Sequence, residues 1–308
     1  MNRQLIGLVL TIAALLSCAQ PNNQKACMNP DPDVSIKGCT VAIQSGQEAT
    51  SNLALDYGNR GSAHDRKGEY DESIADTTKA IELDPTLVAA YINRGAYYSD
   101  KGAYNEAIAD ESRAIWLKPD SAMAYYDRGR AQYLMRHLDE AIADETRAIE
   151  LKPDYADALV MRGISYRNKG RFDEAIADHT KAIGMLPDGA NAYLERAVVY
   201  DAKGLHDLAI ADDSMAIKLD PRNGVGYNNR AWNYHETNED AKGLPDAEKA
   251  VTLASKPEIA AFLGTRAAIY EKLHQRGKAI ADYRTILQLK PSDEESRQGL
   301  KRLGVTAY

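Results

Sequence analysis

The sequence of 308 residues carries a formal net charge of -7 at pH 7, with 44% hydrophobic and 27% charged residues. This balance argues against a nucleic acid as the natural ligand, because phosphate binding needs clustered Lys and Arg. The length alone suggests about two globular domains, but the internal repeats described below favour one continuous repeat array.

Residues 1–17 have the pattern of a secretory signal. One positive charge, Arg3, precedes an apolar run from Leu5 to Leu16. This run is too short for an ordinary membrane-spanning helix, and small residues follow it. We therefore expect an exported protein.

The sequence LLSC, which ends at Cys18, resembles a bacterial lipobox, in which the cysteine becomes the lipid-modified first residue of the mature chain. The alternative is cleavage by a non-lipoprotein signal peptidase, since Ser17-Cys18-Ala19 has small residues at both sites that this enzyme requires. The first reading predicts a lipoprotein of the bacterial outer membrane or periplasm, and the second a soluble periplasmic or secreted protein. Residues 18–30 are expected to form a flexible tether.

Cys27 and Cys39 remain as an even pair once Cys18 is assigned to the lipobox. In an oxidising compartment they can form a disulfide that closes a small loop, and two unpaired thiols are the alternative. Around Cys39, the sequence SIKGCTVAI matches the second-helix pattern found further along the chain. Residues 31–53 are therefore predicted to be a half-repeat and a loop.

A period of 34 residues runs through the chain from residue 54. The prolines that mark it are Pro85, Pro119, Pro153, Pro187, Pro221, Pro257 and Pro291, with one spacing of 36 before Pro257. A small residue precedes each proline by a nearly constant distance: Gly61, Gly95, Gly129, Gly163, Ala197, Ala231 and Ala267. Self-similarity at such a period is the signature of a repeat architecture.

Each period contains two helical patterns. The first, such as YINRGAYY, places a tyrosine four residues before the small residue and usually another three after it, on one helix face. The second, such as AIADETRAIEL, repeats apolar residues three and four apart, as an amphipathic helix does. Between the two, glycines can take the left-handed conformation that ends a helix: Gly68, Gly102, Gly170 and Gly204.

These units resemble tetratricopeptide repeats, whose pattern of Tyr, Gly, Tyr, Ala, Ala and Pro they match over residues 54 to 293. The resemblance implies an all-α fold, a right-handed α-solenoid with an N-terminal half-unit and a C-terminal capping helix at 292–308. The seven predicted units are 54–87, 88–121, 122–155, 156–189, 190–223, 224–259 and 260–291.

Two features depart from the family pattern. The residue before the small one, commonly leucine, is arginine in all seven units, and the aromatic residue expected early in the second helix is mostly polar. The polar residues at this second position are Thr77, Glu111, Glu145, His179 and Asp213. We expect less aromatic packing there.

An aspartate also recurs in every second helix. The arginines are Arg60, Arg94, Arg128, Arg162, Arg196, Arg230 and Arg266, and the aspartates are Asp76, Asp110, Asp144, Asp178, Asp212, Asp246 and Asp282. We predict Arg–Asp pairs between neighbouring helices, because hydrogen-bonded pairs compensate partial burial and specify register. A row of partner-binding arginines is the alternative.

The sixth unit and the C-terminus break the pattern. Gly243 and Pro245 replace two alanines, and two residues are inserted before Pro257. We expect this second helix to start late, near Pro245, with a local change of curvature. A ligand contact or hinge could lie there, and unrepaired sequence drift is the alternative. Ser292 and Glu295 are expected to cap the last helix with a capping box.

The binding surface that the resemblance implies is the concave groove lined by the first helices. The candidate partner-binding residues are Asn59, Asn93, Tyr126, Arg130, Tyr133, Asn229, Trp232 and His235. The asparagines resemble those with which some family members hold a peptide backbone, because an amide both donates and accepts; solvated polar residues are the alternative. Trp232 and Tyr126 are candidate anchors, with core packing as the alternative for Tyr126.

No motif for catalysis, a cofactor or a metal was found, and no two of the six histidines form an i, i+4 pair. We therefore expect no enzyme activity and no cofactor. The function expected is a protein–protein interaction scaffold of the bacterial cell envelope that binds a partner protein or an extended peptide. The alternative is a self-associating structural protein of the envelope.

Overall fold

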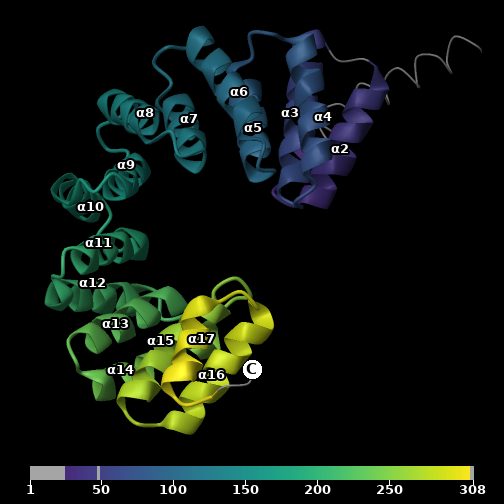
Figure 1. Ribbon diagram of the computed structural model, residues 1–308. Helices are drawn as coiled ribbons and strands as arrows, with labels where there is room; N and C mark the ends of the chain where they lie inside the picture. The colour runs from purple at the N-terminus through teal and green to yellow at the C-terminus, as the bar shows by residue number, and fades with distance from the viewer. Residues whose placement is uncertain (1–24, 47–48, 306–308) are drawn as a thin grey trace, which may run out of the picture. The chain divides into compact units, whose positions relative to one another are not determined.

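The computed structural model describes residues 25–46 and 49–305, so the predictions for residues 1–17 and Cys18 lie outside the described residues. Every regular element in the described ranges is a helix (Figure 1). The chain divides into two compact units, Met1–Pro153 and Asp154–Tyr308, and each is described by itself. The all-α class predicted from the sequence is confirmed.

The first unit is a stack of helical hairpins. Its helices are α2 (Pro32–Ser45), α3 (Thr50–Asp65), α4 (Tyr70–Leu83), α5 (Val88–Asp100), α6 (Tyr104–Leu117), α7 (Ala122–Leu134) and α8 (Leu138–Leu151). The hairpins are α3/α4, α5/α6 and α7/α8, and α2 packs on α3 as a half-unit. The second helix of one hairpin packs on the first helix of the next, α4 on α5 and α6 on α7, as in an α-solenoid.

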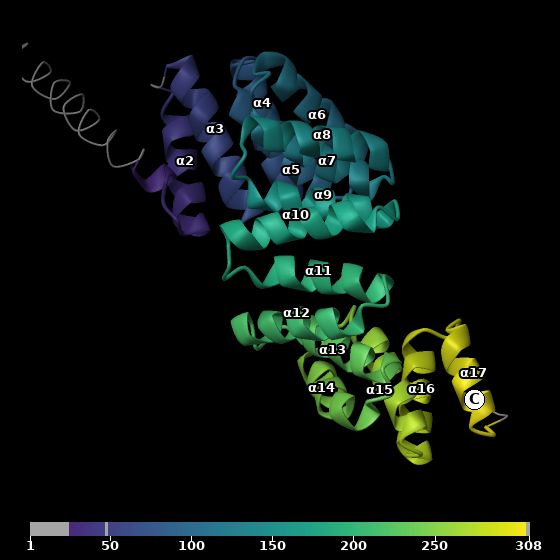
Figure 2. The ribbon, with the colours of Figure 1, turned by 90° about the vertical axis from the view of Figure 1, so that its left-hand side faces the viewer.

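The second unit repeats this arrangement (Figure 2). Its helices are α9 (Ala156–Asn168), α10 (Phe172–Met185), α11 (Ala190–Ala202), α12 (His206–Leu219), α13 (Gly224–Glu236), α14 (Asp240–Leu253), α15 (Ile259–Lys272), α16 (Arg276–Leu289) and α17 (Glu294–Arg302). Four hairpins run from α9/α10 to α15/α16, and α17 packs on α16 at the end.

Small residues allow the two helices of each hairpin to approach closely. In the first helix, a Cβ atom on Gly61 would lie 2.8 Å from Thr77 Oγ1, and one on Gly163 would lie 2.5 Å from the His179 ring. In the second helix, the matching alanines are fully buried: Ala107, Ala141, Ala175 and Ala209. A larger residue at the glycine positions would push the hairpin open.

The turn inside each hairpin requires a residue with positive φ. The four predicted glycines have φ of 70° to 81°: Gly68, Gly102, Gly170 and Gly204. Three other turns place non-glycine residues in the same region, Arg136 at 66°, Asn238 at 59° and His274 at 58°. The prediction for the glycines is confirmed, and the turn conformation is kept even where a side chain makes it costly.

All seven predicted Arg–Asp pairs form. In each repeat, the arginine Nε and Nη2 donate to the two carboxylate oxygens of the aspartate at 2.7 to 2.8 Å. The pairs are Arg60–Asp76, Arg94–Asp110, Arg128–Asp144, Arg162–Asp178, Arg196–Asp212, Arg230–Asp246 and Arg266–Asp282. We call each pair an Arg–Asp bridge. The arginines therefore hold the helices of the repeats together, and they do not form a row of unpaired side chains.

The remaining arginine nitrogen reaches the neighbouring repeat. Arg94 Nη1 donates to Thr78 Oγ1 at 2.9 Å, and Arg128 Nη1 donates to Ser112 Oγ at 3.1 Å. Arg196 with Thr180 and Arg230 with Ser214 make the same contact in the second unit. Each hydroxyl lies on the second helix of the preceding repeat, so one arginine joins three helices.

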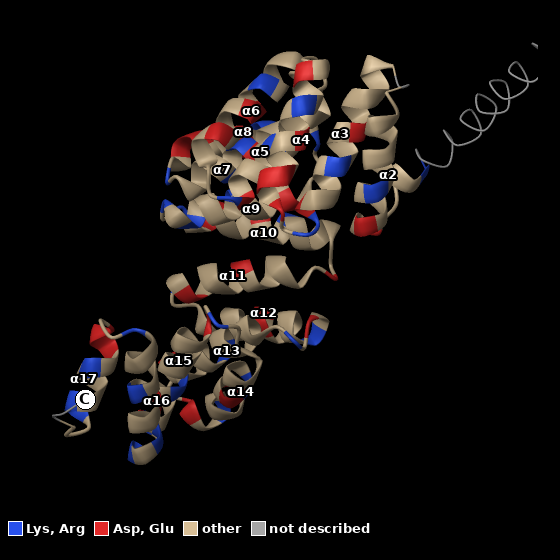
Figure 3. Ribbon diagram, turned by 90° about the vertical axis from the view of Figure 1, so that its right-hand side faces the viewer, with Lys and Arg blue, Asp and Glu red and all other residues tan. Residues whose placement is uncertain are grey.

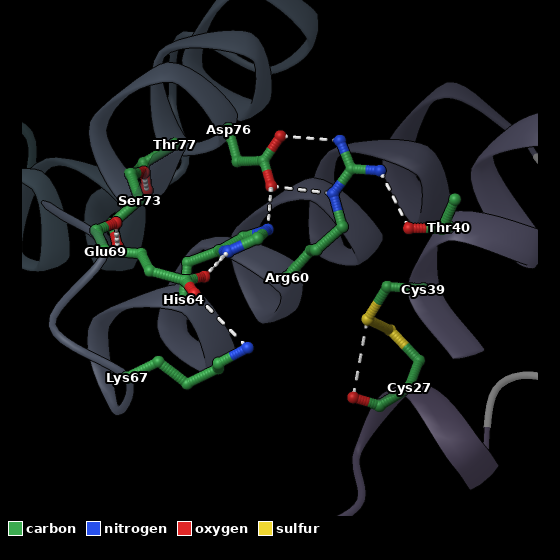
Figure 4. Close-up of polar contacts among 10 residues, drawn as sticks. All are labelled: Cys27, Cys39, Thr40, Arg60, His64, Lys67, Glu69, Ser73, Asp76 and Thr77. Atoms are coloured by element: carbon green, nitrogen blue, oxygen red, sulfur yellow. Dashed lines mark hydrogen bonds and ion pairs between the residues drawn. A yellow bond between two sulfur atoms is a disulfide. The ribbon is translucent and has the colours of Figure 1, made fainter. Parts of the chain in front are cut away.

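Helix α2 makes this contact at the start of the array. Arg60 Nη1 donates to Thr40 Oγ1 of α2 at 3.1 Å, as Arg94 does to Thr78 (Figure 4). Helix α2 therefore occupies the place of a second helix before the first full repeat.

A disulfide fixes the segment that precedes α2. Cys27 is bonded to Cys39 of α2, and both are buried (Figure 4). A Cβ atom on Gly38 would lie 2.6 Å from the Ala26 carbonyl carbon, so this glycine lets the segment pack directly on α2. The bond ties the segment to the half-unit.

The late start expected for the sixth second helix is wrong. Helix α14 begins at Asp240, with Pro245 inside it. Its first turn is held to α13, since His235 Nδ1 lies 2.5 Å from Asp240 Oδ1. A Cβ atom on Gly243 would lie 2.9 Å from the Ala231 carbonyl oxygen, so the glycine permits close packing. These contacts outweigh the one backbone donor that proline removes.

The expected capping box at Ser292 and Glu295 is also wrong. Asp293 is the N-cap of α17, and its Oδ1 accepts from the Ser296 backbone N–H at 2.8 Å. Serine and aspartate are both strong caps, so the pattern alone does not choose between them. Burial of Ser296 and Leu300 sets the register of the helix.

Removing one partner of an Arg–Asp bridge should destabilise the first unit. Asp110→Ala leaves the Arg94 guanidinium, whose side chain is 16% exposed, without its carboxylate. We expect the free energy of unfolding to fall by about 2–4 kcal/mol, measured by chemical denaturation and circular dichroism. The Arg94→Ala, Asp110→Ala double variant should lose less than the sum of the single losses, by about 1–3 kcal/mol.

Lys79→Ala is the matched control, because it removes an exposed pair with Glu82 in the same unit. We expect its effect to stay below about 0.5 kcal/mol. Additive losses in the double variant would contradict a coupled bridge.

Candidate functional site

The first helices of the second unit form one continuous face. Helix α11 contacts α9 on one side and α13 on the other, and α13 contacts α15. The order of these helices can be followed in Figure 2. This face carries Asn229, Trp232 and His235 of the predicted site.

A hollow of about 210 Å³ lies on this face, which we call the α11–α13 hollow. Its lining comes from three first helices: Ala197, Val198 and Asp201 of α11, Asn228, Asn229, Trp232 and Asn233 of α13, and Thr265 of α15. The structure therefore brings two of the predicted residues, Asn229 and Trp232, to one cavity.

Two amide atoms at the α11–α13 hollow are buried without a hydrogen-bond partner. They are Asn228 Oδ1, an acceptor, and Asn229 Nδ2, a donor. A buried polar group without a partner costs about 1–3 kcal/mol, so most such groups in folded proteins are paired. One acceptor and one donor on adjacent residues match the two polar groups of a peptide unit.

The floor of the α11–α13 hollow is held by a chain of polar contacts. Asn233 Nδ2 donates to the Asn229 carbonyl oxygen at 2.9 Å and lies 3.5 Å from Asp213 Oδ2. His206 Nδ1 lies 3.0 Å from Asn233 Oδ1. These contacts fix Asn233, and the first of them ties it to the backbone of the residue that bears the unpaired amide.

Trp232 also borders a second hollow, of about 340 Å³, between α13, α15 and the start of α17. Its indole ring lies 5.4 Å from the His235 ring, centroid to centroid. His235 faces a third hollow, of about 360 Å³, with Glu271, His274 and Arg302. The three hollows thus lie next to one another along α13 and α15.

The other predicted residues lie in the first unit. Asn59 lines a hollow of about 180 Å³ beside Cys27 and Arg66. Arg130 is ion-paired with Asp100 at 3.5 Å. Asn93 on α5 and Tyr126 and Tyr133 on α7 are half-buried. The structure thus does not gather these five residues around one cavity.

Sequence reasoning missed Asn228, Asn233 and Thr265. Thr265 stands two residues before Ala267, just as Asn59, Asn93 and Asn229 stand two residues before the small residues of their own repeats. The run YNNRAWNY carries three asparagines where other repeats carry at most one, and this excess was a usable signal.

The polar residues that replace the expected aromatic residue early in the second helices are fully buried. They are at most 1% exposed: Thr77, Glu111, Glu145, His179 and Asp213. Both Glu111 carboxylate oxygens and both His179 ring nitrogens lack hydrogen-bond partners. Burial raises the pKa of Glu111 to about 10, lowers the pKa of His179 to about 3 and raises the pKa of Asp213 to about 8. The expected loss of aromatic packing is accompanied by uncharged forms of acidic and basic side chains.

The described residues contain no group of three or more His, Cys, Asp or Glu side chains placed to hold a metal ion. None of the helices in the described ranges combines the length and the apolar character needed to cross a membrane.

Family comparisons agree with the repeat geometry. Four models of the tetratricopeptide repeat family match, at residues 54–87, 77–109, 122–155 and 160–224. The crystal structure of MamA is 32% identical, and the match covers 53% of this chain and 95% of that one, with a TM-score of 0.48. This chain belongs to the tetratricopeptide repeat family.

Other tetratricopeptide repeat structures share the fold over more of the chain. A repeat protein from Parabacteroides merdae is 19% identical, covering 83% of this chain and 99% of its own, with a TM-score of 0.64. The Cut9–Hcn1 hetero-tetramer of the APC/C is 15% identical, covering 92% of this chain and 54% of its own, with a TM-score of 0.69. At these identities the likeness shows the fold alone. No curated protein matches the sequence significantly.

The buried carboxyl at Asp213 should make the stability of this tetratricopeptide repeat array depend on pH. The folded protein holds a proton on Asp213 that the unfolded chain releases above its ordinary pKa of 3.8. The contribution of Asp213 to the free energy of unfolding is therefore fully present below about pH 4, and it is lost as the pH rises towards about 8. Replacing the acid by a neutral amide removes this dependence.

We expect Asp213→Asn to gain stability relative to the parent protein between pH 5 and pH 8, by up to about 1.4 kcal/mol per pH unit. Thermal denaturation across this range measures the gain. Asp207→Asn, exposed on the same helix, is the control and should show no such trend. Parallel stability curves for the parent and Asp213→Asn would show that the buried carboxyl is ionised.

Proposed function

We propose that this protein is a scaffold that holds an extended segment of a partner protein on the first helices of its second unit. The observation that carries the proposal is the α11–α13 hollow, where an unpaired acceptor and an unpaired donor lie beside Trp232. The proposed role involves binding and no chemical step.

An extended peptide would satisfy both groups. Its N–H would donate to Asn228 Oδ1, and its carbonyl oxygen would accept from Asn229 Nδ2. Trp232 offers a half-buried ring between two hollows, and large aromatic side chains in such positions dominate many binding interfaces. The free energy that the folded protein spends on unpaired amides would be recovered when the ligand binds.

We further propose that the scaffold works in the bacterial cell envelope, with a lipid on Cys18 as its anchor. Support comes from the signal-like residues 1–17 and the lipobox-like sequence that ends at Cys18. The disulfide between Cys27 and Cys39 fits an oxidising compartment outside the cytoplasm.

Loss of the anchoring groups in the α11–α13 hollow should abolish partner capture. We expect the Asn229→Ala, Trp232→Ala double variant to recover at least about tenfold less partner than the parent protein, because two interface anchors of more than about 1 kcal/mol each are removed. The measurement is chemical cross-linking in the native envelope, followed by quantitative mass spectrometry of the captured proteins.

Trp116→Ala is the matched control, since Trp116 is 67% exposed on α6, a second helix of the other unit. Its capture profile should equal that of the parent. If the double variant captures the same proteins in the same amounts, the hollow is not the binding site.

The anchor is tested separately by Cys18→Ser. A serine cannot form the thioether to the lipid, so we expect the variant to move from the membrane pellet to the soluble fraction. Fractionation of envelopes with quantitative immunoblotting measures this shift. Membrane association that survives the substitution would reject the lipid anchor.

A further inference from the structure

One carboxylate faces the α11–α13 hollow. Asp201 of α11 lines the cavity together with Trp232, and its side chain is 32% exposed. Its neighbour in the structure is the imidazole of His206, whose Nδ1 lies 3.3 Å from Asp201 Oδ1. The carboxylate therefore remains accessible to a ligand in the cavity.

The arginines around this carboxylate are already ion-paired. Arg196 of α11 and Arg230 of α13 belong to Arg–Asp bridges, and Arg167 of α9 lies 3.0 Å from Glu195. Burial raises the pKa of Asp201, and Glu236, at the end of α13, adds a negative charge that raises it further. Acidic and basic residues are interspersed over the helices (Figure 3), but the arginines of α9, α11 and α13 offer the hollow no unpaired positive charge.

Trp232 also suits a cation, because it presents an aromatic ring to the hollow. A guanidinium group is planar, donates several hydrogen bonds in one plane and stacks on indole rings. The chain uses this stacking elsewhere, since the Arg113 guanidinium lies 4.0 Å from the centre of the Trp116 ring.

We propose that the α11–α13 hollow binds an arginine side chain of the partner, with the guanidinium donating to Asp201 and stacking on Trp232. This inference rests on the proposed scaffold function and adds the chemistry by which the segment is chosen. Asn229 would hold the peptide backbone, and Asp201 would select the side chain.

The test uses tryptophan fluorescence. The sequence has two tryptophans, so Trp116→Phe leaves Trp232 as the single reporter in the full chain. The probes are the blocked pentapeptides Ac-Ala-Ala-Arg-Ala-Ala-NH2, its citrulline counterpart and its glutamate counterpart. Citrulline keeps the shape of arginine but carries no charge, so it isolates the contribution of Asp201.

We expect the arginine peptide to change Trp232 fluorescence saturably and to bind at least about tenfold more tightly than the citrulline peptide. Asp201→Asn should reduce this preference to about twofold or less, and Asp207→Asn, exposed on α12, should leave it unchanged. Equal binding of arginine and citrulline peptides, tighter binding of the glutamate peptide, or no saturable change with arginine would each overturn the inference.

The capture experiment separates this inference from the proposed function. If Trp232→Ala abolishes partner capture while Asp201→Asn leaves it intact, the scaffold function stands and the arginine preference fails. If neither substitution reduces capture, both fail.

Discussion

The Arg–Asp bridge is the interaction on which the rest of this structure depends. A pair of helices cannot bury its apolar face alone, so a repeat array is stable only when each hairpin is held in register with its neighbour. Here one guanidinium joins the two helices of its own hairpin and also joins that hairpin to the preceding repeat. Two of its nitrogens bind the aspartate of its own hairpin, and the third binds a hydroxyl of the preceding repeat. Tyrosines flank the same guanidinium, as Tyr91 and Tyr98 do at 6.0 and 5.9 Å from Arg94. These contacts hold the guanidinium within the helix packing, and the residues proposed to bind a ligand lie at other positions.

The buried polar residues of the second helices are the counterpart of that rigidity. Slots that are aromatic in the family pattern hold Glu111, His179 and Asp213, and the resulting unpaired atoms cost stability. Below the α11–α13 hollow, polar side chains hold one another in place. Asp213 and His206 both contact Asn233, and Asn233 donates a hydrogen bond to the backbone carbonyl oxygen of Asn229. The amide that we propose binds the ligand is thus held by groups that the repeat pattern alone would not require. Functional sites commonly keep such locally unfavourable groups, and the bridges supply the stability that tolerates them.

The N-terminal end of the array is completed by different chemistry. Helix α2 supplies Thr40, the hydroxyl that Arg60 requires, so the first full repeat meets the same surface as the repeats inside the array. The Cys27–Cys39 disulfide ties the described residues before α2 covalently to this half-unit.

The sequence by itself determined the repeat, the helix pairs, the glycine turns and the Arg–Asp bridges. Each of these features depends on contacts between residues at a fixed separation along the sequence. The 34-residue period repeats such separations through the array, so the pattern can be recognised without a structure. Tertiary structure alone decided where single residues act. Helix α14 starts at Asp240 despite Pro245 because His235 and the close approach at Gly243 hold its first turn, and Asp293 caps α17 because Leu300 and Ser296 set the register. Of the predicted site residues, only Asn229 and Trp232 share the α11–α13 hollow, and they are joined there by three residues that were not predicted, Asn228, Asn233 and Thr265. A cavity forms where side chains of three helices fail to fill space, and that depends on the packing of every neighbour rather than on any spacing along the chain.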